Sequence, residues 1–232
     1  PDIPTLPAEI KGRMSIVIDD MGEDLRLAQG LAETGLKLTF AVWPASSEKD
    51  RIRELAHRHG LDLMVHLPMQ PLGYPDMDPG PGALFVTMTP QEIETTIKWN
   101  LDQIPEAVGV NNHMGSLFTA DLQGMTSALT AISRRGLFFL DSRTIGKSSG
   151  HAAALATRTP FYSRDVFIDN EKNIAYIIGQ LRKAEAMARR RGSAIAIGHP
   201  HPETLAALRQ WNMNKGADIL VVSITGLPPE TP

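Results

Sequence analysis

The 232-residue sequence contains no cysteine. This absence excludes disulfide bonds, cysteine-ligated zinc, iron–sulfur clusters and thiol nucleophiles, so a metal site must be built from His, Asp, Glu or Asn. No stretch approaches 18 consecutive apolar residues, and the sequence therefore predicts no transmembrane helix. Lys and Arg together number 23 against 26 Asp and Glu, a net charge of −3. Without an excess of positive charge, nucleic acid is not an expected partner.

The length and the 42% of hydrophobic residues suit one large domain. Prolines at positions 1, 4 and 7 indicate an extended leader over residues 1–12. We expect a single domain over residues 13–228 and a short tail over residues 229–232. Because the chain begins at Pro1 rather than Met and shows no signal peptide, we also expect that a signal segment preceded it.

Short apolar runs recur along the whole chain. They occupy residues 14–20, 38–43, 61–66, 107–110, 137–140, 161–168, 194–197 and 219–222. Near-continuous runs of this length are typical of strands buried on both faces. Helical periodicity lies between the runs, as in the apolar stripe of Ile93, Ile97, Leu101 and Ile104. The alternation predicts an α/β fold, with a parallel sheet that is closed as a barrel or open and helices outside it.

A segment rich in proline and glycine interrupts this rhythm at residues 68–90. Thr89, Pro90 and Glu92 have the pattern of a helix start, with a capping hydroxyl, a proline in the first turn and an acidic residue after it. We interpret the segment as a long surface loop, either without a role or as part of a binding site.

Polar clusters close several of the expected strands. They are Asp19-Asp20-Met21-Gly22, His66-Leu67-Pro68-Met69, Asn111-Asn112-His113-Met114-Gly115-Ser116, Asp141-Ser142-Arg143-Thr144 and Gly198-His199-Pro200. In parallel α/β folds the carboxyl ends of the strands carry the active site, because loops and helix N-termini converge there. The clusters therefore predict one shared site.

Four of the clusters also have a purely structural interpretation. One of the two aspartates could cap the following helix, and His66 could be a hydrogen-bonded core residue. Residues 111–116 could be a polar turn, and Asp141 and Arg143 could form a local ion pair and nothing more.

As one site, Asp20, His66 and His113 offer a carboxylate and two imidazoles to a divalent metal and leave positions open for water and substrate. Zinc is the expected ion, although cobalt, nickel or iron also suit these donors. Water on such an ion loses a proton near neutral pH. Asp19 would take this proton and His199 would give one to the leaving group, which predicts hydrolysis of an amide or ester.

Four further residues at strand ends are candidates to hold the substrate or to orient the catalytic groups. They are Trp43, Asn112, Asp141 and Arg143. Trp43 could stack against a sugar ring, since it ends the second strand on the expected site side. Trp99 and Trp211 fall on helical stripes instead and are expected in the core.

The segment Ile18-Asp19-Asp20-Met21-Gly22 looks like the F-D-D-G motif of polysaccharide deacetylases, carbohydrate esterase family 4. The five clusters in order resemble the divergent polysaccharide deacetylase family, from about residue 13 to 228. This resemblance implies a distorted (β/α) barrel of about seven parallel strands. It also implies metal-dependent N-deacetylation of a glycan in the periplasm or outside the cell. By the same resemblance Asp19 matches the catalytic base, Asp20 a metal ligand and His199 the catalytic acid.

The sequence departs from the ordinary family pattern at two places. Ordinary members carry two metal-ligating histidines four residues apart on the third strand, whereas His66 is followed at that spacing by Gln70. An Arg-x-Pro motif on the fourth strand is replaced by Asn111-Asn112-His113. Two alternatives to a glycan deacetylase therefore stay open: a catalytically silent glycan-binding or cell-envelope protein on the same fold, and a barrel hydrolase of a small amide.

Overall fold

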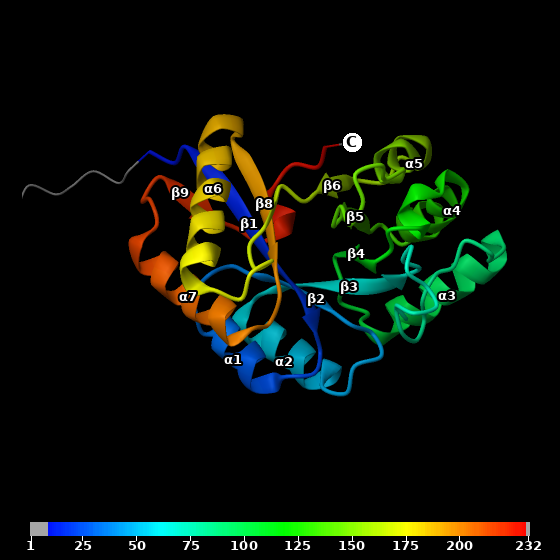
Figure 1. The fold of residues 1–232 in the computed structure, drawn as a ribbon, viewed down its shortest axis with the longest axis horizontal. Helices are drawn as coiled ribbons and strands as arrows, with labels where there is room; N and C mark the ends of the chain where they lie inside the picture. The colour runs from blue at the N-terminus through cyan, green and yellow to red at the C-terminus, as the bar shows by residue number, and fades with distance from the viewer. Residues whose placement is uncertain (1–8, 231–232) are drawn as a thin grey trace, which may run out of the picture.

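The computed structural model describes residues 9–230, in which strands and helices alternate (Figure 1). The strands are β1 (Gly12–Met21), β2 (Thr39–Val42), β3 (Asp62–Met69), β4 (Gly109–Met114), β5 (Phe138–Asp141), β6 (Phe161–Ser163), β7 (Val166–Phe167), β8 (Ser193–Gly198) and β9 (Ile219–Val221). The α-helices are α1 (Leu25–Ala32), α2 (Lys49–His59), α3 (Pro90–Gln103), α4 (Leu122–Ser133), α5 (Gly150–Thr157), α6 (Ile174–Arg191) and α7 (Pro202–Asn214). Two 3₁₀ turns, η1 (Phe118–Ala120) and η2 (Ile224–Gly226), complete the described part.

All strand pairs are parallel, in the order β6-β5-β4-β3-β2-β1-β8-β7, and β9 pairs with β1. The helices lie outside this curved sheet (Figure 1). The predicted α/β fold and distorted barrel are thus confirmed. The apolar run at 161–168 forms two strands rather than one, because β6 pairs with β5 whereas β7 pairs with β8. These two strands are the ends of the path, so the barrel stays open between them. The described residues accordingly hold nine strands rather than about seven.

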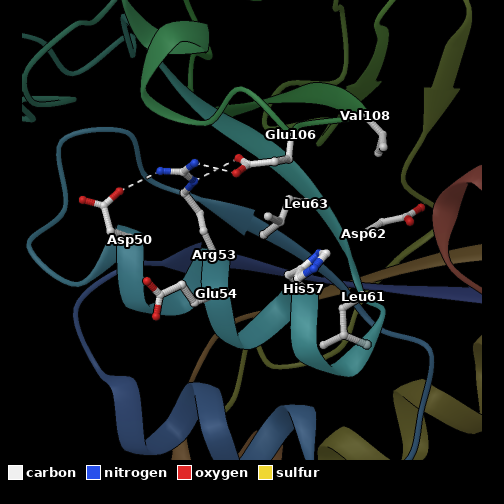
Figure 2. A pocket seen from close by; sticks show the side chains of 9 residues that line it. All are labelled: Asp50, Arg53, Glu54, His57, Leu61, Asp62, Leu63, Glu106 and Val108. Atoms are coloured by element: carbon white, nitrogen blue, oxygen red, sulfur yellow. Dashed lines mark hydrogen bonds and ion pairs between the residues drawn. The ribbon is translucent and has the colours of Figure 1, made fainter.

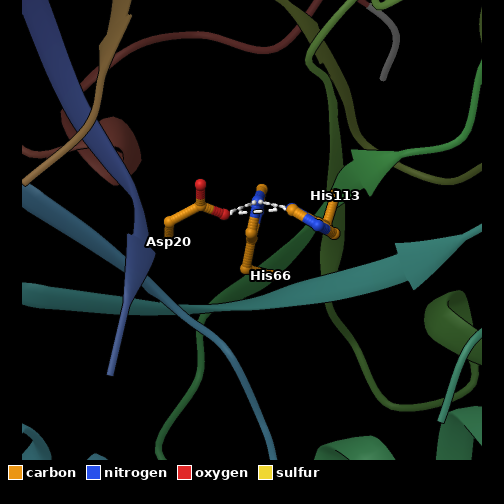
Figure 3. Close-up of side chains that lie close together, drawn as sticks. All are labelled: Asp20, His66 and His113. Carbon is orange, nitrogen blue, oxygen red and sulfur yellow. Dashed lines mark hydrogen bonds and ion pairs between the residues drawn. The ribbon is translucent and has the colours of Figure 1, made fainter. Parts of the chain in front are cut away.

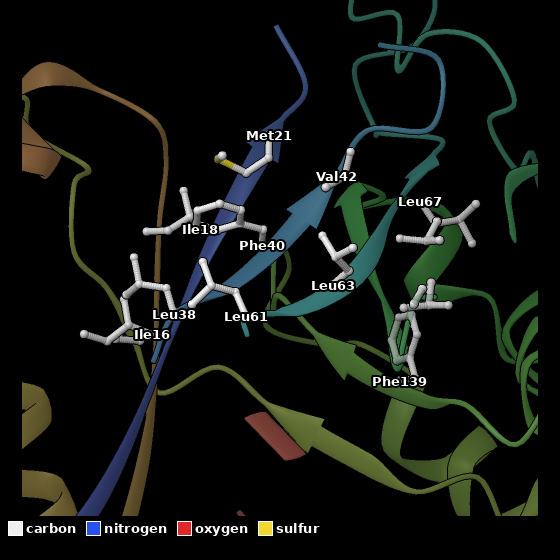
Figure 4. Packing of buried hydrophobic residues seen from close by; sticks show 14 of the residues in the cluster. Ile16, Ile18, Met21, Leu38, Phe40, Val42, Leu61, Leu63, Leu67 and Phe139 are labelled. Carbon is white, nitrogen blue, oxygen red and sulfur yellow. The ribbon is translucent and has the colours of Figure 1, made fainter. Parts of the chain in front are cut away.

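The strands are apolar on both faces because the sheet is covered on both. Ile16 and Ile18 belong to the large cluster between strands and helices, whereas Val17 belongs to a second cluster inside the curved sheet. Figure 4 shows part of the first cluster, which includes Phe40 and Leu63. Burial on both sides explains the near-continuous apolar runs and leaves the polar residues to the strand ends.

The helix caps settle one structural alternative. The Asp24 side chain accepts a hydrogen bond from Leu27 N at 2.9 Å and caps α1, so the interpretation of Asp19 or Asp20 as the cap is wrong. The predicted start of α3 is confirmed, because Thr89 and Glu92 form a reciprocal capping box.

The two tryptophans expected in the core differ. Trp211 is 2% exposed and donates its indole N–H to the buried Glu185 carboxylate, as expected. Trp99 is 43% exposed, so its expected place in the core is wrong. Its ring lies against the backbone of Gly82 in the loop after β3, where a Cβ would stand 2.6 Å from Cζ3 of the indole.

The expected ends of the domain are described only in part. Residues 1–8 of the leader and residues 231–232 of the tail lie outside the described part. β1 already begins at Gly12. Glu230, in the expected tail, donates its backbone N–H to Phe161 O of β6. Among residues 9–230, no helix is both long enough and apolar enough to span a membrane.

A hollow of about 660 Å³ lies between α2, the first residues of β3 and the segment just before β4 (Figure 2). In its wall, Arg53 donates hydrogen bonds to both Glu106 carboxylate oxygens and to Asp50. None of the residues of the five strand-end clusters lines this hollow. The candidate site therefore has to be found at the opposite ends of the strands.

We predict that Gly109→Ala lowers the free energy of unfolding by about 1–3 kcal/mol, because a Cβ at the start of β4 would lie 2.3 Å from Cε2 of Phe138. Gly179→Ala is the matched control. Gly179 lies in α6 with no atom near its added Cβ, so this change should stabilise the protein by about 0.5–1 kcal/mol. Urea unfolding of both variants measures the difference. Equal stability of Gly109→Ala and the unmodified protein would contradict the packing described here.

Candidate functional site

Three of the predicted residues meet at the carboxyl ends of β1, β3 and β4 (Figure 3). Asp20 Oδ1 lies 3.1 Å from His66 Nε2 and 3.0 Å from His113 Nδ1. The two imidazole nitrogens are 3.1 Å apart. Three donor atoms from three strands thus form a nearly equilateral triangle, as the strand-end argument predicts.

A break in the regularity of β1 places both aspartates around His66. Alternation along a strand would put neighbouring side chains on opposite faces. Here the register to β2 shifts between Ile18 and Met21, and Asp20 adopts φ +52°. A positive φ is uncommon for a residue other than glycine, and it turns the Asp20 carboxylate toward the same ring that Asp19 approaches. Asp19 Oδ1 lies 3.8 Å from His66 Nδ1, so each ring nitrogen has one carboxylate near it.

The side-chain amide of Asn111 fixes the orientation of His66. Asn111 Nδ2 donates to Asp19 Oδ1 at 2.7 Å, since a carboxylate can only accept from an amide. The amide oxygen of Asn111 must then face His66 Nδ1, 2.8 Å away, and this nitrogen carries the hydrogen. In the neutral ring, the lone pair is consequently on Nε2, the atom that points at Asp20 and His113. Sequence reasoning named Asn111 only as a member of its cluster and missed this role.

His113 reaches the triangle because β4 continues beyond the level of His66. His66 is paired with Asn111 in the β3–β4 register, and His113 stands two residues further on, on the same face as Asn111. The indole of Trp43 stacks against the His113 ring at 5.5 Å between centroids, with 29° between the planes. Gly80 in turn lies on the indole, where a Cβ would be 2.7 Å from Cζ2.

Gln70, which stands where ordinary members carry a second histidine, connects loops instead. Its side-chain oxygen accepts from Val86 N, and its backbone oxygen accepts from Leu117 N and Phe118 N. Its backbone N–H donates to Leu84 O. Gln70 therefore joins the loop after β3 to the turn after β4 and contributes nothing to the triangle.

Burial and mutual charge set the electrostatics of the site. Burial raises the pKa of Asp19 above its usual value, although His66 and His199 oppose this. Burial acts in the same direction on Asp20, but the two histidines outweigh it and lower the pKa of this carboxyl. For His66, the Asp19 and Asp20 carboxylates outweigh burial and raise the pKa to about 9.

His199 is held by a carboxylate that the sequence analysis did not identify. Its Nδ1 lies 2.9 Å from Asp169 Oδ1, and its backbone N–H and the Thr204 hydroxyl both donate to Asp169 Oδ2. Burial would lower the pKa of His199, but Asp169, together with Asp19 and Asp20, raises it. Asp169 follows the apolar run at 161–168, so the signature used for the other clusters could have found it.

The remaining candidates differ in what they touch. Asn112 points away from the triangle and orders the turn after β5, since its Oδ1 accepts from Ser142 N at 2.9 Å and its Nδ2 donates to Met114 O. The local ion pair considered for Asp141 and Arg143 is not formed. Instead the buried Asp141 carboxylate accepts from the backbone N–H of Arg143 at 2.7 Å. The polar turn considered for residues 111–116 is also wrong for its first half, because Asn111–Met114 belong to β4.

The triangle fits a divalent cation. Asp20 Oδ1 is buried and makes no hydrogen bond with any described residue, although two imidazole nitrogens lie near it. Atoms with lone pairs this close repel one another unless a proton or a cation lies between them. Two imidazoles and one carboxylate are ligands that zinc and the neighbouring transition metals accept. The partner of His66 Nδ1, the Asn111 amide, supplies the orienting hydrogen bond that metal-ligating histidines usually have.

The chain is similar to known proteins in both sequence and structure. The sequence is 38% identical over 218 residues to the uncharacterized protein YibQ of Escherichia coli K12, a match that covers 94% of this chain and 68% of YibQ. The crystal structure of the uncharacterized protein ATU2773 of Agrobacterium tumefaciens C58 superposes with a TM-score of 0.89 at 27% identity, over 96% of this chain and 91% of that one.

A more distant likeness concerns the fold alone. The structure of a mutant of BA3943, a carbohydrate esterase family 4 pseudoenzyme with restored enzymatic activity, has a TM-score of 0.56 at 14% identity. It covers 96% of this chain and 68% of that one.

The family model of the divergent polysaccharide deacetylases matches residues 16–227, nearly the whole of the described domain. The chain belongs to the divergent polysaccharide deacetylase family.

Proposed function

We propose that this protein is a metal-dependent hydrolase that removes acetyl groups from an N-acetylated polysaccharide. The observation that carries the proposal is the convergence of Asp20, His66 and His113, with the buried Asp19 carboxylate beside the same imidazole. The family supports the reaction class. We place the activity in the periplasm or outside the cell, where N-acetylated wall glycans are found.

Asp20, His66 and His113 would hold the metal, and zinc is the ion we propose. Bound there, a divalent ion would polarise the amide carbonyl and make water more acidic. Asn111 supports this function by keeping the lone pair of His66 on Nε2. Trp43 supports it by stacking on the His113 ring.

Asp19 is the proposed general base. Asn111 donates to one of its carboxylate oxygens, and no described residue donates to the other, Oδ2. Oδ2 is thus available to take a proton from the attacking water. Burial raises the pKa of Asp19 toward the working pH, which suits a group that must gain and lose a proton in each turnover.

His199 is the proposed general acid. The Asp169 carboxylate holds its Nδ1 and leaves Nε2 for the substrate. In the proposed hydrolysis of the acetamide, the water oxygen bonds to the acetyl carbon and the carbon–nitrogen bond breaks. His199 protonates the departing nitrogen, so that the products are acetate and a free amine on the sugar.

We predict that the purified protein binds about one divalent ion per chain and that Asp20→Asn, His66→Ala and His113→Ala each lose it. Removal of a ligand should weaken binding by more than the roughly 10–100-fold that loss of a ligand's hydrogen-bond partner costs. Metal analysis after dialysis and calorimetric titration with Zn²⁺ measure the effect. The control is His57→Ala, since His57 is exposed on α2. Full metal occupancy in His113→Ala would show that β4 supplies no ligand.

Variants of two neighbouring asparagines on β4 distinguish an effect on metal binding from an effect on folding stability. Asn111→Ala should weaken Zn²⁺ binding by roughly 10–100-fold, because His66 loses the acceptor that fixes its tautomer. Asn112→Ala is the matched control: it removes the contact to Ser142 N and should lower stability while it leaves Zn²⁺ affinity within about threefold. Calorimetry and thermal unfolding of the same preparations give both quantities. Equal Zn²⁺ affinity of the two variants would refute the role of Asn111.

The pH dependence of acetate release tests the acid and the base. Asp19 must be unprotonated and His199 protonated, so the rate on chitooligosaccharides should rise as pH passes the raised pKa of Asp19 and fall as it passes that of His199. Asp169→Asn removes the charge that raises the pKa of His199, so the alkaline limb should move to lower pH.

Asp19→Asn should abolish acetate release and retain the metal. If the unmodified, metal-loaded protein binds these oligosaccharides and releases no acetate, the silent glycan-binding alternative replaces the enzyme. If it acts on small amides with no gain from glycan length, the small-amide hydrolase replaces it.

A further inference from the structure

Two arginines stand together on the rim of the site, in the segments that follow β5 and β6. Arg143 comes two residues after the end of β5, and Arg164 lies between β6 and β7, where the barrel is open. Ser142, next to Arg143, accepts a hydrogen bond from Asn111, which contacts both Asp19 and His66. The guanidinium of Arg164 lies 3.8 Å above the Phe167 ring, which stacks on His199. The pair is therefore linked to both the proposed base and the proposed acid.

Arg143 is held in an uncommon backbone conformation. Its φ is +52°, and the buried Asp141 carboxylate accepts its backbone N–H. Arg164 supports the same turn, because its Nε donates to Ser142 O at 2.7 Å and a terminal nitrogen donates to Arg143 O at 3.1 Å. Three contacts thus fix the backbone from which the Arg143 side chain extends. A residue held in a costly conformation by several interactions is characteristic of functional sites.

The guanidinium of Arg143 is exposed and forms no ion pair or hydrogen bond with any residue in the part of the chain described. Burial and the charge of Arg143 lower the pKa of Arg164, although the Asp141, Asp165 and Asp19 carboxylates oppose this. Neither Asp141 nor Asp165 pairs with the Arg143 guanidinium: Asp141 accepts the backbone N–H of Arg143, and Asp165 accepts from Arg191 and from Ile195 N. An exposed guanidinium whose N–H donors are all unpaired can bind an external carboxylate or phosphate through two parallel hydrogen bonds.

We propose that Arg143, positioned by Arg164, binds a carboxylate or phosphate carried by the glycan, so that the preferred substrate is an acidic N-acetylated polysaccharide. This inference rests on the proposed function, because it treats the bound glycan as the substrate of the deacetylation. The recognition itself is a binding property and does not depend on turnover.

The experiment compares charged and neutral ligands of the same size. The carboxylate arm uses a tetrasaccharide of alternating N-acetylglucosamine and glucuronic acid against its methyl ester. The phosphate arm uses N-acetylglucosamine 6-phosphate against N-acetylglucosamine. Affinities are measured by calorimetry on Zn²⁺-loaded protein that carries Asp19→Asn to prevent turnover. We expect at least one arm to favour the anion by roughly tenfold, a preference that shrinks as salt is added.

Arg143→Gln should abolish this preference, whereas Arg143→Lys, which keeps the positive charge, should retain part of it. The matched control is Arg158→Gln. Arg158 is also exposed and also has a positive φ, +55°, but it caps the far end of α5, before β6 begins. Equal affinity for anion and neutral partner in both arms, or a preference that survives Arg143→Gln, overturns the proposal. If the protein prefers the anion but releases no acetate when Asp19 is intact and the metal is bound, this inference stands while the proposed function fails.

Discussion

The site depends on the orientation of one buried amide. The side-chain amide of Asn111 donates its N–H to Asp19, and its oxygen then accepts from His66 Nδ1. This single choice keeps the proposed base hydrogen-bonded and directs the lone pair of His66 at Asp20 and His113. A buried polar chain of this kind is costly when one member is unsatisfied and rigid when all are satisfied. Its position between β1, β3 and β4 explains why residues 92 and 45 positions apart along the chain act together.

Local strain accompanies this arrangement. Within the described residues, four residues other than glycine have a positive φ, and three of them, Asp20, Met114 and Arg143, lie at the carboxyl ends of β1, β4 and β5. A regular strand would send its last side chains alternately inward and outward. At the irregular end of β1, the Asp20 carboxylate turns toward His66 and His113 instead. The stable, doubly covered sheet supplies the free energy that holds these conformations.

The sequence predicts the scaffold and the members of the triangle well, because both follow from simple periodicity. A parallel strand buried on both faces must be apolar, so the polar residue that ends it is conspicuous, as with Asp20, His66 and His113. The sequence does not reveal which asparagine of Asn111-Asn112 faces the site, since that depends on the β3–β4 register. It also does not reveal that the run at 161–168 crosses the open seam. Both halves of the run are apolar, although β6 pairs with β5 and β7 pairs with β8. Trp99 misleads because helical periodicity does not distinguish packing on a loop from packing in the core.

Gln70 and His113 together explain how the site differs from the ordinary family pattern. Two histidines four residues apart on one strand would tie the ligand set to the segment that leaves β3. In this chain that segment begins at Gln70 and is fastened to the turn after β4, while β4 itself carries the second histidine. The two strands are register partners up to Met69 and Met114, so the proposed role of His113 as the second histidine ligand requires β3 and β4 to stay paired to their last residues. The hydrogen bonds of Gln70 lie immediately beyond that pairing and keep the strand ends together. The glutamine thus supports the proposed ligand set from the position at which the ordinary family pattern has a histidine.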